Sequence, residues 1–208
     1  MHDATYTPPA SLDRLRLRSL IAGLAGLALV AIGGFLNPQH FFQSYLLAFL
    51  FCLAAPLGGL ALLMLQHLTG GNWGVVLRRT FEAAARTLPW MALLFVPLVF
   101  GLSTLYPWTD TAAVAADHIL RGKALYLNVP FFLARAALYF AVWVGLAFFL
   151  TTWSRQQDQS GDPALKRRMR ALSAIGIVLY AFSMTFAAFD WGMSLDPHWF
   201  STMYGFLF

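Results

Sequence analysis

Five long apolar stretches dominate this chain and restrict the folds open to it. A hydrocarbon layer about 30 Å thick requires roughly 20 consecutive apolar residues in a helix. The apolar residues run on without the period-two alternation that a membrane-spanning strand shows. The sequence therefore predicts an all-α, polytopic membrane protein with a single membrane domain over residues 1–208. We expect spans at residues 19–36, 44–66, 86–105, 129–152 and 171–190, with the start of a sixth at 197–208.

Composition agrees with this prediction and limits the chemistry of the chain. Hydrophobic residues make up 59% of it and charged residues only 11%, too few for the surface of a soluble protein of this size. The one cysteine, Cys52, lies inside the second apolar stretch. A disulfide framework, a cysteine-ligated cluster and a CxxCH haem attachment are therefore excluded. We expect the chain to bind no cofactor of its own.

The positions of the cations predict the orientation in the membrane. The segments that connect successive spans are alternately rich and poor in basic residues, and the segments rich in basic residues are expected in the cytoplasm. The net charge of +5 thus reports topology rather than a nucleic-acid partner. We expect residues 1–18 to be cytoplasmic and the first span to be retained as a helix rather than cleaved as a signal peptide. The rich segments contain Arg14, Arg16, Arg18, Arg78, Arg79, Arg155, Lys166, Arg167, Arg168 and Arg170, whereas the poor ones hold only Arg121 and Lys123.

Three charged residues lie at the predicted cytoplasmic entrance to the third span. Arg78, Glu82 and Arg86 are spaced four apart, which places them along one helix face. One interpretation is an interfacial ladder of ion pairs that fixes the depth of the helix. The other is that Glu82, together with His67 at the inner end of the second span, begins a proton path.

A charged side chain that is costly to bury in the membrane lies in the fourth span, towards the opposite side. Arg135 is six residues into the fourth span, about 9 Å along a helix that rises 1.5 Å per residue. Its side chain either extends to the headgroups or pairs with a buried carboxylate. Asp190, at the outer end of the fifth span, has a matching depth, so we expect an ion pair or a shared water cluster.

The segment after the fifth span contains an unusual concentration of polar and aromatic residues. Asp196 suits a helix N-cap and Pro197 suits the first helical position, which predicts the start of the sixth span there. Trp191, Trp199 and Tyr204 would then form an aromatic belt at the outer interface. Neither prediction explains why the titratable side chains of Asp190 and His198 flank the turn.

Small residues mark the expected helix contact faces. Ala22, Gly26, Gly33 and Gly34 recur in the first span, and Gly58 and Gly59 are adjacent in the second. Because a missing side chain lets two helices approach closely, these positions favour helix packing within the bundle or with other subunits.

Residues 189–205, FDWGMSLDPHWFSTMYG, resemble a signature of the smaller NrfD-like membrane subunit of alternative complex III, a bacterial quinol:electron-acceptor oxidoreductase. Residues 44–74 (SYLLAFLFCLAAPLGGLALLMLQHLTGGNWG), residues 76–102 (VLRRTFEAAARTLPWMALLFVPLVFGL) and LYPW at 105–108 agree with the same family in the same order. The resemblance implies two successive four-helix bundles with flanking helices. The chain contains the first bundle with its N-terminal helix and ends within the sixth span, so the second bundle is expected to be missing.

The resemblance also implies a role in a respiratory electron-transfer complex. The partners would be a larger NrfD-like membrane subunit, an iron–sulfur subunit, c-type cytochrome subunits and a terminal oxidase, all in the bacterial cytoplasmic membrane. Quinol, c-type haem and iron–sulfur clusters would belong to those partners, because the family's quinol site is assigned to the larger subunit. This chain would be a scaffolding subunit without catalytic residues of its own. By motif match, its proton-path candidates are His67, Glu82, Arg86, Arg135, Asp190, Asp196 and His198.

Two alternatives to this function stay open. A stand-alone proton-coupled carrier would be consistent with prolines inside the spans and with paired charges, but it requires a polar site at mid-membrane. A purely structural anchor for a haem or oxidase partner would be consistent with the small-residue contact faces.

Overall fold

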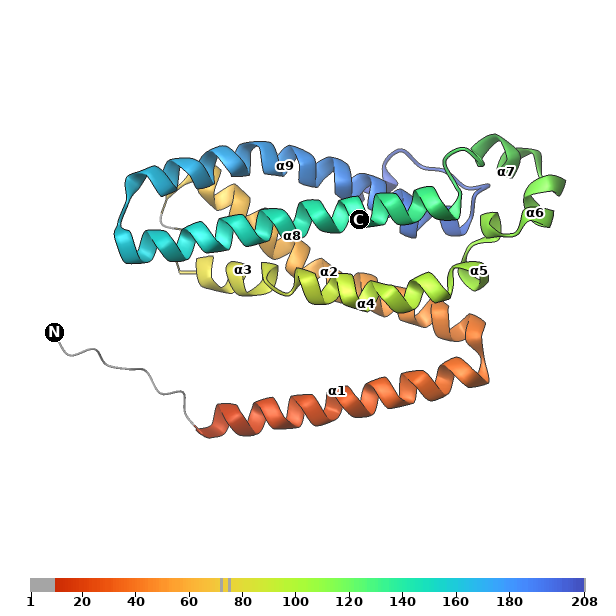
Figure 1. The fold of residues 1–208 in the computed structure, drawn as a ribbon, viewed down its shortest axis with the longest axis horizontal. Coiled ribbons are helices and arrows are strands. Elements are labelled where there is room, and N and C mark those ends of the chain that lie inside the picture. Colours follow the sequence, from red (N-terminus) through yellow and green to blue (C-terminus); the bar gives the residue numbers. More distant parts are fainter. Residues whose placement is uncertain (1–9, 72, 75, 208) are drawn as a thin grey trace.

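The computed structural model of the chain describes residues 10–71, 73–74 and 76–207, and within these ranges the fold is all-α (Figure 1). Residues 1–9 of the expected cytoplasmic segment lie outside the described residues. The elements are α1 (Ala10–Leu36), α2 (Pro38–Thr69), α3 (Arg78–Ala85), α4 (Leu88–Phe100), α5 (Leu102–Leu105), η1 (Pro107–Thr109), α6 (Thr111–Ala116), α7 (His118–Lys123), α8 (Val129–Ser160), α9 (Pro163–Trp191), η2 (Met193–Leu195) and α10 (Tyr204–Leu207).

Five helices are long and apolar enough to cross a membrane, as the sequence predicted. They establish the chain as a multi-pass membrane protein. Helices α2 and α8 each have 32 residues, about 48 Å at 1.5 Å per residue, so their ends extend beyond the hydrocarbon layer. The spans are Leu12–Gly34, Pro38–Thr69, Arg78–Phe100, Val129–Ser160 and Pro163–Leu195.

An Asn or Asp followed closely by proline begins each of the three longest bundle helices. Asn37 accepts a hydrogen bond from the His40 N–H before α2, and Asn128 accepts one from the Phe131 N–H before α8. Asp162 does the same for α9. Each side chain satisfies a backbone donor that the first helical turn leaves free, and proline loses nothing at that position.

The expected helix start at Asp196 and Pro197 is wrong. Asp196 Oδ1 accepts from the backbone N–H of His198 at 3.1 Å, and the segment turns instead of continuing as a helix. The Pro197 carbonyl, which would begin a helical ladder, accepts a hydrogen bond from Lys123. Helix α10 begins only at Tyr204, and residue 208 of the expected sixth span lies outside the described residues.

Four spans form one bundle, with α2, α8 and α9 packed together and α3 with α4 completing the fourth side (Figure 1). The third span breaks between Ala85 and Leu88, because Pro89 has no N–H to donate to the carbonyl four residues earlier. Gly59 of α2 lies at the close contact with α3: a Cβ added there would be 2.8 Å from the Cβ of Ala84. This confirms one of the predicted small-residue contact faces.

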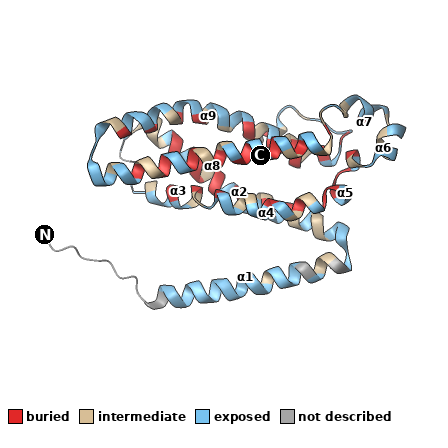
Figure 2. Ribbon diagram, viewed as in Figure 1, coloured by how far each residue is buried: buried red, intermediate tan, exposed pale blue. Residues whose placement is uncertain are grey.

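Helix α1 lies apart from most of the bundle, and its main contact among the described residues is with α2 (Figure 1). None of the residues in its most apolar stretch is buried, whereas 44% of those in the corresponding stretches of α2 and α8 are buried (Figure 2). Added Cβ atoms at Gly26 and Gly33 would meet nothing within 4 Å. At Gly34, in contrast, an added Cβ would lie 3.5 Å from the Phe41 ring of α2. Gly26 and Gly33 therefore make no close helix contact within the described part of the chain.

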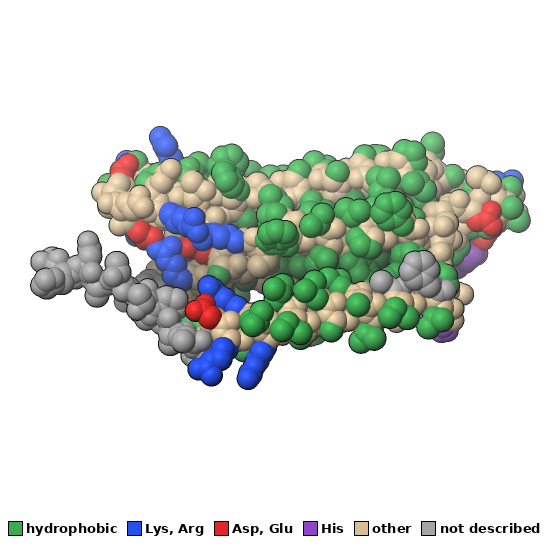
Figure 3. Space-filling view, turned by 60° about the horizontal axis from the view of Figure 1, so that its bottom comes forward, with side chains coloured by type: hydrophobic (Ala, Val, Ile, Leu, Met, Phe, Trp, Pro, Cys, Tyr) green, Lys and Arg blue, Asp and Glu red, His purple; other side chains and the backbone are tan. Residues whose placement is uncertain are grey.

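The bundle has two chemically different ends. The basic end, where α3 begins and α8 turns into α9, carries Arg78, Arg79, Arg86 and Arg155. The loop end carries α6, α7 and the segment 190–203. Figure 3 shows the cations of the visible face gathered mainly at the basic end. The two candidate clusters of polar residues lie at these two ends.

Candidate functional site

At the loop end, Arg135 of α8 and Asp190 of α9 form a buried, bidentate ion pair. Arg135 Nε lies 2.7 Å from Asp190 Oδ2, and Nη2 lies 2.8 Å from Oδ1. The Asp190 side chain is fully buried and that of Arg135 is 9% exposed. This confirms the predicted pair and excludes the alternative in which Arg135 extends to the headgroups.

Residues that the sequence analysis did not single out complete the surroundings of this pair. Tyr139, one turn after Arg135 on α8, donates its hydroxyl to Asp190 Oδ2 at 2.7 Å. Arg135 Nη1 donates to the Tyr126 carbonyl at 2.9 Å, and its guanidinium lies 3.8 Å from the centre of the Tyr126 ring. The spacing of Arg135 and Tyr139 is a four-residue signal that would have identified Tyr139. Tyr126 lies in a loop and gives no such signal.

The negative charge of Asp190 extends its influence to the neighbouring phenols. Burial, and then the charge of Asp190, raise the pKa of Tyr126 to about 12. The same two causes raise the pKa of Tyr106 above its ordinary value of 10.0. Both phenols therefore stay protonated at neutral pH and are available as hydrogen-bond donors.

The segment after α9 is held to the rest of the loop end by side chains from the α5–α8 connection. Tyr106 donates its hydroxyl to the Trp191 carbonyl at 3.0 Å, and Lys123 Nζ donates to the Pro197 carbonyl at 2.5 Å. His198 Nε2 lies 2.7 Å from Asp117 Oδ2. His198 therefore pairs with Asp117 of an exposed loop and not with the buried Asp190.

Asp117 is both the N-cap of α7 and the partner of His198. Its Oδ1 accepts from the backbone N–H groups of Ile119 and Leu120 at 2.7 and 3.4 Å. Burial of the carboxyl opposes ionisation, but these two N–H groups and His198 outweigh it, so the pKa of Asp117 lies below its ordinary value of 3.8. Asp117 thus begins the short helix α7.

The predicted aromatic belt is only partly correct, because Trp191 lies in the core. Its side chain is 0% exposed, and its ring lies 5.0 Å from Phe95 and 5.7 Å from Phe140, measured between centroids. Helix α9 ends at Trp191, one residue beyond the expected span, and this last residue is still inside the bundle. Trp199, in contrast, is 49% exposed and contacts Tyr204 edge to face.

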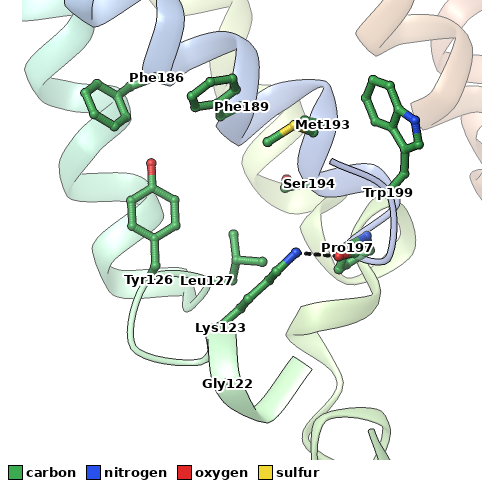
Figure 4. A pocket seen from close by; sticks show the side chains of 10 residues that line it. All are labelled: Gly122, Lys123, Tyr126, Leu127, Phe186, Phe189, Met193, Ser194, Pro197 and Trp199. Carbon is green, nitrogen blue, oxygen red and sulfur yellow. Dashed lines mark hydrogen bonds between the residues drawn. The ribbon is translucent and has the colours of Figure 1, made fainter. Parts of the chain in front are cut away.

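A cavity of about 330 Å³ lies beside the segment after α9 (Figure 4). The Lys123 side chain crosses it to reach the Pro197 carbonyl, and the Tyr126 hydroxyl points into it. The Tyr126 hydroxyl has no hydrogen-bond partner among the described residues. Phe186, Phe189, Met193 and Trp199 supply an apolar wall. Lys123 and Tyr126 therefore bring one ammonium group and one phenol to a cavity whose other wall is apolar.

At the basic end, Glu82 of α3 is the centre of a second cluster. Its carboxylate accepts from Arg79 Nη1 at 2.7 Å and lies 3.4 Å from Arg78 Nε. The Ser154 hydroxyl of α8 donates to the remaining oxygen. Only 1% of the Glu82 side chain is exposed, so the carboxylate is buried inside the bundle. Asp158 of α8, which the sequence analysis also missed, bridges the same two arginines.

The expected ladder from Arg78 through Glu82 to Arg86 is wrong in its third member. The described residues place no carboxylate within 4 Å of Arg86, because α3 ends at Ala85 and the Arg86 side chain lines a separate cavity beside Arg155. Arg79 takes the place predicted for Arg86. The outer candidate Asp196 is exposed, and among the described residues its side chain accepts only the hydrogen bond from the His198 N–H already described.

His67 lies near the Glu82 cluster without a direct bond to it. Arg78 and Glu82 act on it electrostatically, and its Nε2 atom is buried with no hydrogen-bond partner among the described residues. On the antiparallel helix α9, Ser173 has a buried hydroxyl in the same situation. Met64 of α2 contacts Gly176 of α9. Because the two helices are antiparallel, His67 and Ser173 each lie about one turn closer to the basic end than this contact, and therefore at a similar level.

The two clusters are separated by a mainly apolar core. The polar contact between them is the hydrogen bond from Trp143 Nε1 to Ser183 Oγ, 2.8 Å long and buried. Leu60, Met64 and Leu150 are each completely buried. The described side chains offer no continuous chain of hydrogen bonds between the two ends.

No protein-family model matches this chain, and no curated protein matches it. Its own geometry defines a multi-pass helical membrane protein with one buried polar cluster at each end of the bundle.

Proposed function

We propose that this chain is a membrane subunit of a quinol-oxidising electron-transfer complex in the bacterial cytoplasmic membrane. Its main role is to scaffold the complex, and its titratable clusters exchange protons at the two membrane faces. The N-terminus and the basic end lie in the cytoplasm, in agreement with the positive-inside rule. The proposal rests on the resemblance of residues 189–205 and on how those residues are used.

One observation carries the scaffolding role. Within residues 189–205, Asp190 holds Arg135, Pro197 receives Lys123 and His198 pairs with Asp117. One contact thus joins α9 to α8, and two join the segment after α9 to the α5–α8 connection. Because residues 189–205 make these contacts, they hold the surface of the loop end in a fixed shape. A fixed surface is expected of a subunit that positions its partners.

The uncovered helix α1 supports membership of a membrane assembly. Its apolar residues are exposed along its length and its glycines leave a surface without side chains. In a complex, such a helix packs against another membrane subunit through close backbone contact. The partners proposed are the larger NrfD-like subunit, an iron–sulfur subunit and c-type cytochromes, with a terminal oxidase as acceptor. Quinol, haem and iron–sulfur clusters would be bound by those partners.

Purification from native membranes tests the assignment. Tagged protein extracted in mild detergent would be analysed by subunit masses and by a reduced-minus-oxidised visible spectrum. Co-purification of c-haem and an iron–sulfur protein, with haem reduction by added quinol, is the expected result. A colourless protein that purifies alone would reject the complex and favour the stand-alone carrier.

The proton role has a separate test in the intact complex. Glu82→Gln and Asp190→Asn remove one titratable carboxylate from each cluster while keeping its shape. We expect quinol turnover to continue with altered proton uptake or release, measured with a pH dye in reconstituted vesicles. Unchanged proton coupling in both assembled variants would reject the proton role and leave a purely structural anchor.

A further inference from the structure

A second cavity, of about 320 Å³, lies at the basic end between the start of α4 and α8. Arg86 and Arg155 both line it, together with the side chains of Thr151 and Thr152. Towards the middle of the span its wall becomes apolar, formed by residues that include Pro89 and Phe148. The cavity is therefore cationic on one side and apolar on the other.

The two arginines in this cavity have no counter-charge of their own. Among the described residues, no carboxylate lies within 4 Å of Arg86 or of Arg155, while the charge of Arg155 acts unfavourably on that of Arg86. Glu82, an acid that acts on Arg86, already accepts from Arg79 and Ser154. Two guanidinium groups that line one cavity without an anion repel each other, and a bound anion would remove this cost.

The position of the cavity in the membrane identifies the kind of anion. The apolar part of α8 ends at Trp153, so Arg155 lies at the boundary between hydrocarbon and headgroups. Phe148, almost two turns deeper on α8, is 61% exposed at the bundle surface. Basic pockets between membrane helices at this depth suit the phosphate of an anionic lipid. The hydroxyl of Thr152 adds a donor, and arginine binds phosphate oxygens in a bidentate manner.

We propose that Arg86 and Arg155 bind the phosphate of an anionic phospholipid, whose acyl chains lie against Phe148 and the neighbouring apolar surface of α4 and α8. Arg86 thereby has a role separate from the proton path predicted for it. The site belongs to this chain alone and does not depend on the proposed electron-transfer complex.

Native mass spectrometry of the full chain tests this proposal. The protein would be released from vesicles of phosphatidylethanolamine and phosphatidylglycerol in a 3:1 ratio, and retained phosphatidylglycerol would be counted. The test variant is Arg86→Gln with Arg155→Gln. The matched control, Arg167→Gln with Arg168→Gln, removes two exposed cations from the same end that do not line the cavity. We expect phosphatidylglycerol binding about tenfold weaker in the test variant, equivalent to about 1.4 kcal/mol, and unchanged in the control.

Three outcomes would overturn the proposal. Equal loss in both variants would mean diffuse attraction to a basic surface. Retention of phosphatidylglycerol by the test variant would show that the arginines do not bind it. Displacement of the lipid by millimolar inorganic phosphate would identify a site for the free anion. If the double variant does not fold, Arg155→Gln alone gives the same comparison against Arg167→Gln, because Arg155 is exposed.

Discussion

Arg135 and Asp190, 55 residues apart in the chain, meet as a bidentate ion pair inside the loop end of the bundle, with both N···O distances below 3 Å. The pair joins the first two turns of α8 to the last turn of α9. Tyr139 donates a second hydrogen bond to Asp190 Oδ2, so the carboxylate accepts three hydrogen bonds in all. A buried pair held in this way fixes the relative rotation of two helices, and breaking it leaves a buried charge without a partner.

Asp190→Asn should therefore destabilise the fold by about 3–5 kcal/mol, because it leaves the Arg135 cation buried beside a neutral amide. Thermal unfolding in detergent measures the loss. Replacing both residues, as Arg135→Met with Asp190→Leu, should recover much of it, since no unpaired charge then remains. Equal stability of wild type and Asp190→Asn would show that the pair contributes nothing to helix packing.

Stability at low pH should depend on Asp117. Its pKa is lower in the folded protein than the ordinary 3.8, so its contribution is complete above that value and is lost as the pH falls through the lower folded-state pKa. The pH dependence of thermal unfolding between about pH 2.5 and 6 measures this loss. In Asp117→Asn the acid-dependent part should shrink. A variant with an unaltered acid profile would assign the loss to other carboxyl groups.

Adjacent glycines of α2 should respond oppositely to the same substitution. Gly59→Ala places a Cβ 2.8 Å from Ala84 Cβ and 3.2 Å from the Phe81 carbonyl, so α3 must move. We expect a loss of about 1–3 kcal/mol in thermal unfolding. Gly58→Ala meets nothing within 4 Å and should be neutral or stabilising by up to about 1 kcal/mol. Similar effects at both positions would contradict the close contact of α2 with α3.

At the basic end, the buried carboxylate of Glu82 should contribute more to the free energy of unfolding than the exposed carboxylate of Asp158. Glu82→Gln weakens the bonds from Arg79 and Ser154 within a site that is 1% exposed, and we expect a loss of about 1–3 kcal/mol. Asp158→Asn, at a carboxylate that is 38% exposed, should cost less than about 1 kcal/mol. Chemical unfolding in mixed micelles compares the two variants. The reverse order would mean that Asp158, and not Glu82, organises the arginines.

Local features were predictable from the sequence because their causes are local. The five spans follow from the length of each apolar run, which has to match the bilayer wherever the helix packs. The ion pair of Arg135 and Asp190 was also predictable, since helical rise alone places both residues at one depth. The starts of α2, α8 and α9 follow from an Asn or Asp beside a proline.

Positions set by contacts between distant segments were not predictable. Asp196 and Pro197 carry the same start signal, yet Lys123 and Asp117, more than 70 residues earlier, bind this segment and hold it in a turn. Arg79 rather than Arg86 pairs with Glu82 because of where α3 ends.

The sequence by itself determined that this protein crosses the membrane as helices, and at what depth each costly side chain lies. Only the tertiary structure decided that Arg79 pairs with Glu82 in place of Arg86, that Trp191 fills the core, and that Arg86 and Arg155 share a cavity without an acid. The physical reason is that depth follows from rise along one helix, whereas pairing depends on the rotation and end of two helices that meet in space.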